Sequence, residues 1–104
     1  MEHAVIVHIP LSTGQFGTED ERETLFTVED RLVSAIDRAG AGEFDGNEFG
    51  DGEATFYMYG PDADRLFRAV EPVLRMHPVF RGGYAVKRYG PAVDPASREQ
   101  RVEL

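Results

Sequence analysis

The stretch over residues 3–9 constrains the fold most, because nearly every position in it is apolar and four are β-branched. These four are Val5, Ile6, Val7 and Ile9. Such a run is typical of a strand that is buried on both faces, or on all but one position. We therefore predict that residues 3–9 form a central strand of a sheet.

An amphipathic helix is predicted after a loop over residues 10–18, which is rich in Pro and Gly. Thr18 and Glu21 match a capping box at its start. An alternative start at Thr27, with Asp30 as the box partner, stays open. The expected buried stripe steps by three and four along one face and consists of Leu25, Val28, Leu32, Ile36 and Ala39.

Residues 43–59 alternate as a β-hairpin does, with Gly50-Asp51-Gly52 as the predicted turn. A loop of this length pairs Phe44 with Met58 and Gly46 with Phe56. We prefer this register because it gathers apolar residues on one face, whereas a slip by one would scatter them.

A second helix is predicted from Gly60-Pro61-Asp62, with Pro61 in the first turn, and Pro78 ends it. A last strand is predicted over residues 84–89. The polar tail, residues 91–104, includes a candidate short edge strand at residues 101–104.

The predicted order is strand, helix, strand, strand, helix, strand, and over residues 3–89 this order resembles the ferredoxin-like fold. The order of elements carries the resemblance, and no sequence motif does. It implies an α+β sandwich, with two helices on one face of an antiparallel four-stranded sheet in the order 4-1-3-2. The expected domain spans residues 1–90. Proteins with this fold have many different functions, so the fold alone does not indicate which function this chain has.

The composition of the chain limits the classes of function that it can have. The chain has 104 residues, which is one domain by length, with 19 acidic and 11 basic residues and a formal net charge of −8. Nucleic acids and anionic membranes are bound mainly through Lys and Arg. The excess of acidic residues therefore argues against nucleic acids and against membranes as partners. There is no cysteine, which excludes disulfides, thiolate nucleophiles and Cys-ligated metals.

The beginning of the chain and its Arg usage suggest a location and a source. Glu2 precedes the first apolar run where a secretory signal would carry basic residues. That run is also far shorter than the ~20 residues that a membrane span needs. We expect a cytoplasmic protein, and ten Arg against one Lys favour a GC-rich bacterial genome.

The side of the sheet that carries no helix is the first candidate binding surface. The residues expected there are His8, Thr55, Tyr57, Tyr59, Lys87 and Tyr89. RNA-recognition motifs stack bases on aromatic residues at such places, but their basic glycine-aromatic signature is absent here. Tyrosine also suits protein interfaces, so we expect a protein partner or a second copy in a homodimer. A plain solvated face is the alternative.

The second candidate surface is an acidic end, where the predicted topology brings together residues 10–23, residues 48–53 and residues 77–83. Its candidate residues are Glu19, Asp20, Glu21, Glu48, Asp51 and Glu53. The segment 45–53 resembles a calcium loop in composition only, because Phe49 and Phe56 occupy ligand positions. The loop at Gly14–Thr18 has Gly17 where a P-loop requires Lys. We predict no metal and no cofactor.

Three classes of function follow. The preferred one is a non-enzymatic binding or regulatory protein, of which an acidic inhibitor or immunity-type protein masking a basic partner is a sharper version. The second is a small-molecule sensor domain. The third is a small enzyme that uses His8 or His77 with carboxylates such as Glu48 and Glu53, and it requires a His and a carboxylate within hydrogen-bond reach.

Overall fold

The computed structural model describes residues 2–104, which form two long helices, one short 3-10 helix and five strands. In chain order these are β1 (His3–Pro10), α1 (Glu19–Ala39), β2 (Glu43–Gly50), β3 (Glu53–Gly60), α2 (Ala63–Met76), η1 (Pro78–Phe80), β4 (Tyr84–Arg88) and β5 (Glu99–Glu103). The protein is an α+β fold in which two helices pack on an antiparallel five-stranded sheet.

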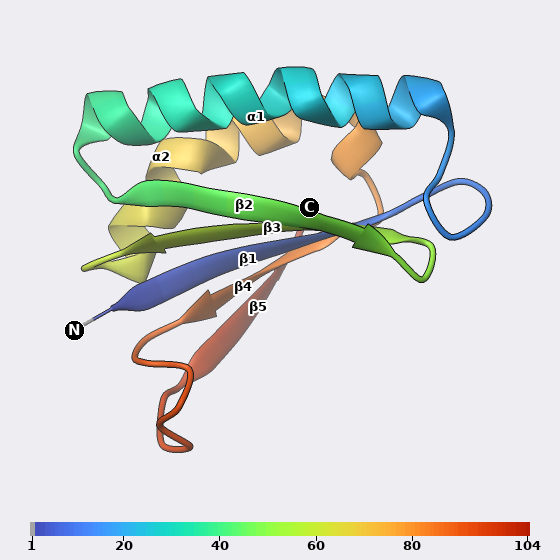
Figure 1. Cartoon of the computed structure of the whole chain (residues 1–104). Coiled ribbons are helices and arrows are strands. Elements are labelled where there is room, and N and C mark those ends of the chain that lie inside the picture. Colours follow the sequence, from blue (N-terminus) through green and yellow to red (C-terminus); the bar gives the residue numbers. More distant parts are fainter. Residues whose placement is uncertain (1) are drawn as a thin grey trace.

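The strands lie in the order β2-β3-β1-β4-β5, and every neighbouring pair is antiparallel. The predicted central strand is therefore in the middle of the sheet, and β1 to β4 have the predicted order. The sheet has five strands and not the four that the ferredoxin-like order implies. The fifth is the candidate edge strand of the tail, β5, which pairs with β4 and spans Glu99–Glu103 rather than residues 101–104. Both helices lie on the same side of the sheet (Figure 1).

Helix α1 begins where the capping box predicts, so the alternative start at Thr27 is wrong. The Glu21 backbone N–H donates to Thr18 Oγ1 at 3.1 Å, and the Glu21 carboxylate accepts from the Thr18 backbone N–H at 2.9 Å. This carboxylate also accepts from the backbone N–H and the hydroxyl of Ser12. One side chain thus caps the helix and holds the loop that leads into it.

The hairpin between β2 and β3 differs from the predicted register. Its turn has two residues, Asp51 and Gly52, both with positive φ (54° and 76°), as a tight hairpin turn requires. Phe44 pairs with Met58 as predicted, but Gly46 pairs with Tyr57 and not with Phe56. A shift in the ladder between Phe44 and Gly46 leaves Asp45 unpaired and corrects for the shorter turn.

Helix α2 begins at Ala63, two residues after Pro61, which the prediction places in the first turn. Asp62 is its N-cap and accepts from the backbone N–H groups of Asp64 and Arg65, while Pro61 lies before the cap and not in the first turn. The core between the helices and the sheet contains the predicted stripe of α1, where Leu25, Val28, Leu32 and Ile36 are fully buried. Within residues 2–104, neither helix is long and apolar enough to cross a membrane.

Candidate binding face

We call the helix-free side of the sheet the open face, although Ala4, Thr55 and Arg88 on this side are themselves buried. Val5, Val7 and Ile9 of β1 are fully buried toward the helices, so the alternate side chains of β1 point the other way. Residues directly opposite in an antiparallel ladder share a face. On β3, β1 and β4 the open face therefore carries Glu53, Thr55, Tyr57, Tyr59, Ala4, Ile6, His8, Tyr84, Val86 and Arg88. On the edge strands it carries Glu43, Gly46, Glu48, Glu99, Arg101 and Glu103.

Two of the six residues predicted for this face lie on the other side of the sheet. Lys87 pairs with Val5 and points toward α2, where its Nζ lies 2.9 Å from Oδ1 of Asp64. The Tyr89 hydroxyl donates to the same carboxylate oxygen at 2.6 Å. The placement of Lys87 and Tyr89 on the helix-free face was thus wrong, because the register between β4 and β1 sets the side on which β4 residues point.

The other four predicted residues, His8, Thr55, Tyr57 and Tyr59, do lie on the open face. Tyr84 and Val86 also lie on the open face, although the prediction did not include them. The alternation of β4 puts Tyr84 and Val86 on one side and Ala85 and Lys87 on the other, but it does not tell which side faces the helices.

Tyrosine and aliphatic side chains form the centre of the open face. Tyr57, Tyr59, Tyr84, Ile6 and Val86 are all partly exposed there. Burial raises the pKa of Tyr57, and the negative charge of nearby Glu48 raises it further. The Tyr57 hydroxyl therefore stays protonated at neutral pH and can donate a hydrogen bond to a partner.

A row of stacked and hydrogen-bonded side chains crosses this face near the hairpin end. The His8 ring stacks on the Tyr84 ring with centroids 4.7 Å apart, and the Arg101 guanidinium lies 3.7 Å from the same tyrosine centroid. His8 Nδ1 lies 2.8 Å from Glu53 Oε1, and Arg101 pairs with Glu103. This row joins β3, β1, β4 and β5. In it the positive charge of Arg101 interacts with Glu103 and with the Tyr84 ring of the same chain.

Two of the three segments predicted to form the acidic end, residues 10–23 and 48–53, do meet. The Leu11 backbone N–H donates to the Gly52 carbonyl at 2.8 Å, and the Gly52 N–H donates to the Gln15 carbonyl at 2.9 Å. The hairpin turn is thereby held against the loop that precedes α1.

The acidic residues of this end nevertheless have separate surroundings. Glu21 is engaged in the cap of α1, and Glu53 contacts His8. Glu48 lies on the open face, while Glu19, Asp20 and Asp51 are exposed. Across residues 2–104, no group of three or more His, Asp or Glu side chains is arranged to hold a metal ion.

His77 has a different neighbourhood from His8. It forms the C-terminal boundary of α2, and its Nε2 lies 3.3 Å from Nη1 of Arg31 on α1. The prediction that it interacts with a carboxylate has no counterpart among the hydrogen bonds of the described chain. Of the two candidate histidines, His8 alone is paired with a carboxylate there.

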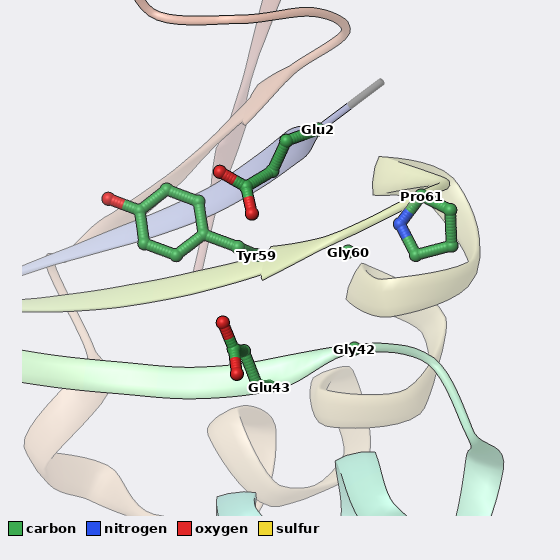
Figure 2. Close-up of a pocket in the computed structure, with 6 residues that line it drawn as sticks. All are labelled: Glu2, Gly42, Glu43, Tyr59, Gly60 and Pro61. Atoms are coloured by element: carbon green, nitrogen blue, oxygen red, sulfur yellow. The ribbon is translucent and has the colours of Figure 1, made fainter.

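A pocket of about 430 Å³ lies at the other end of the open face, where β1 begins. Figure 2 shows the side chains of Glu2 and Glu43 projecting toward Tyr59 from either side of β3. Gly42, Gly60 and Pro61 complete the lining, and the Gly60 backbone lies close to that of Ala41. A Cβ on Gly60 would lie 2.2 Å from the Ala41 carbonyl oxygen, so only glycine fits there.

The chain was compared with protein-family models, with curated proteins and with solved structures, and none of the three comparisons gives a match. The function is accordingly argued from the open face and its chemistry alone.

Proposed function

We propose that this chain is a non-enzymatic binding or regulatory protein that binds a protein partner through the open face. The observation that carries the proposal is a group of partly exposed side chains at the centre of the open face. The group consists of Tyr57, Tyr59, Tyr84, Ile6 and Val86. Aromatic centres surrounded by polar side chains are typical of protein interfaces, where tyrosine buries its ring and keeps its hydroxyl at the rim. Here the surrounding side chains come from the edge strands β2 and β5.

The arrangement of the elements supports this proposal without selecting the partner. We propose that the fold is ferredoxin-like with one added edge strand, because β1 to β4 follow the order 4-1-3-2 and both helices cover one face. The added β5 widens the open face by Glu99, Arg101 and Glu103. A wider face gives a partner more area to bury than four strands would.

The enzyme hypothesis is the second candidate, and one observation favours it. His8 and Glu53 are within hydrogen-bond reach, as acid–base catalysis by such a pair requires. The nearby hydroxyl of Thr55 donates to Glu53 Oε1 at 3.4 Å. Glu53 thus lies between Thr55 and His8, whereas an activated nucleophile contacts the histidine directly. This geometry favours a structural role for the pair over catalysis.

The test compares two double variants of the full chain. Tyr57→Ser with Tyr59→Ser removes two of the three tyrosines of the open face, while Val33→Ser with Met76→Ser removes two exposed apolar side chains from the helices. Proteins retained by each immobilised variant are compared with those retained by the wild type, and circular dichroism checks that both variants fold. Sedimentation velocity on the same samples tells whether the partner is a second copy.

We expect the open-face variant to lose the partner, or to convert a dimer to a monomer, while the helix variant keeps it. Loss of a central interface tyrosine costs more than 1 kcal/mol in many complexes, so two such losses reduce binding by roughly tenfold or more. Equal binding by wild type and the open-face variant would refute the proposal. Turnover of a substrate that depends on both His8 and Glu53 would instead support the enzyme hypothesis.

A further inference from the structure

The charged side chains of the open face differ in whether they have a partner within the chain. Arg101 pairs with Glu103 and stacks on Tyr84. Arg88 is only 9% exposed, and its Nε donates to the chain's own Gly90 carbonyl at 2.7 Å. Arg101 is therefore already paired, and Arg88, which shares a cross-strand row with Ala4 and Tyr59, is buried and is not presented to a partner.

Three carboxylates of the open face have no such compensation. Within residues 2–104, the side chains of Glu2, Glu43 and Glu48 take part in no hydrogen bond and no ion pair. Two of them, Glu2 and Glu43, line the pocket at Tyr59 from opposite sides (Figure 2). The pocket thus presents a tyrosine ring between two carboxylates at one end of an aromatic surface.

This combination favours a cation. An ammonium or guanidinium group gains from the face of a tyrosine ring and from nearby carboxylates at the same time. The neighbouring aromatic and aliphatic side chains, Tyr57, Ile6 and Val86, offer apolar contacts outside the pocket. A partner that combines basic and apolar side chains is therefore complementary to both parts of the surface.

A second copy of this chain is a poorer match. A two-fold interface places the same patch on both sides, so it would bring a second set of these carboxylates toward the first. The chain as a whole, with a net charge of −8, repels another copy in the same way. A free small amine is also a poorer match, since the shallow pocket would leave most of such a ligand exposed.

We infer that the open face binds a basic segment of a partner protein, and that an Arg or Lys side chain of this segment packs against Tyr59 between Glu2 and Glu43. This inference rests on the proposed function, since it assigns the chemistry of the partner that the open face receives. It also assigns Glu2 and Glu43, which the sequence analysis did not select, to the binding surface.

The test measures fluorescence anisotropy of a labelled peptide of alternating Arg and Leu, with alternating Glu and Leu as the reference peptide. The face variant is Glu2→Gln with Glu43→Gln. The matched control, Glu19→Gln with Glu23→Gln, removes the same charge from the exposed first turns of α1. Tyr59→Leu tests the ring, and titrations at low and at physiological salt test the electrostatic contribution.

We expect the Arg peptide to bind and the Glu peptide not to bind. The face variant should weaken the Arg peptide by roughly fivefold at low salt, and the control by less than about twofold. Tyr59→Leu should weaken it by roughly threefold. Equal effects of the face variant and the control would overturn the inference, because they would show attraction to the net charge alone. Free arginine binding as tightly as the peptide would overturn the choice of a protein segment.

Failure of this inference is distinguishable from failure of the proposed function. If the Arg peptide does not bind, but the retained partner is still lost from the Tyr57→Ser and Tyr59→Ser double variant, the inference fails and the proposed function stands. The opposite result is also possible: the Glu2→Gln and Glu43→Gln variant binds the Arg peptide more weakly, while the Tyr57→Ser and Tyr59→Ser variant retains the partner as well as the wild type does. In that case the proposed function fails.

Discussion

His8 Nδ1 and Glu53 Oε1 lie 2.8 Å apart on the open face, although the two residues are 45 positions apart in the sequence. The contact joins the end of β1 to the beginning of β3, and 24% and 42% of the two side chains are exposed. His8 also stacks on Tyr84, so its ring is oriented by a partner on each neighbouring strand. The pair therefore fixes Nδ1 as the ring nitrogen of His8 that faces Glu53.

We predict that the neutral form of His8 carries its proton on Nδ1. An ionised carboxylate can only accept, so Nδ1 must be the donor in this contact. Long-range ¹H–¹⁵N correlation spectra above neutral pH will identify the tautomer. Glu53→Gln should relax the preference because an amide can donate as well as accept, whereas Glu48→Gln should leave it unchanged. A proton found on Nε2 in the wild type would contradict the observed contact.

The close approach at Gly60 predicts a large effect of a single methyl group. In Gly60→Ala the new Cβ would lie 2.2 Å from the Ala41 carbonyl oxygen, so the backbones must move apart. We expect a loss of about 1–3 kcal/mol in the free energy of unfolding. At Gly46 a Cβ meets nothing within 4 Å, so Gly46→Ala should change stability by less than ~0.5 kcal/mol. Urea unfolding of both variants measures the difference, and equal stabilities would show that the approach is looser than described.

Acid should weaken the protein in part through Glu21. The backbone N–H of Thr18 lowers the pKa of Glu21 most, burial opposes this, and the hydroxyl and N–H of Ser12 lower the pKa further. A carboxylate with a lowered pKa in the folded state contributes stability above its unfolded pKa, near 4.5. That contribution is lost as the pH falls through the folded pKa.

Unfolding midpoints measured between about pH 6 and pH 3 will show this loss. Glu21→Gln keeps a residue that suits the capping box but removes the titration, so its stability should depend less steeply on pH. Glu19→Gln removes a carboxylate from the same helical turn and should keep the wild-type slope. A wild-type slope in Glu21→Gln would show that other groups cause the acid sensitivity.

The hydrogen bond between Tyr89 and Asp64, on the helix side of the sheet, predicts a lowered pKa of the Asp64 carboxyl group. The Tyr89 hydroxyl lowers the pKa of Asp64 most, followed by the hydrogen bond from Lys87. Tyr89→Phe should therefore raise the pKa of Asp64 toward its ordinary value. Carboxyl ¹³C chemical shifts followed against pH measure the change, with Tyr59→Phe as the control that removes an open-face hydroxyl. An unchanged Asp64 titration in Tyr89→Phe would contradict the assigned hydrogen bond.

The hairpin shows where sequence reasoning about register stops. The alternation over residues 43–59 predicts both strands and the pair Phe44 with Met58, as observed. The turn uses Asp51 and Gly52 only, and the irregularity at Asp45 then restores the predicted pair. Asp51 adopts a positive φ, which aspartate tolerates better than most residues, so the three-residue and two-residue turns were both compatible with the sequence.

The pocket at Tyr59 shows why one of its residues could be predicted from the sequence and two others could not. Tyr59 belongs to a strand whose alternation is clear, so its side of the sheet followed from β3 alone. Glu2 and Glu43 stand just before β1 and at the beginning of β2, and no local pattern links them. They meet because β1 and β2 flank β3, which is a consequence of strand order.

By itself the sequence determined the kinds of elements, the central position of residues 3–9 and the start of α1. These depend on apolar periodicity, side-chain branching and caps, all of which act within a few residues. Only the tertiary structure decided that Lys87 and Tyr89 face α2, that the tail strand begins at Glu99 and pairs with β4, and that Glu2 and Glu43 line one pocket with Tyr59. A strand has two sides that differ by one residue of register, and that register is set by pairing with strands distant in the sequence.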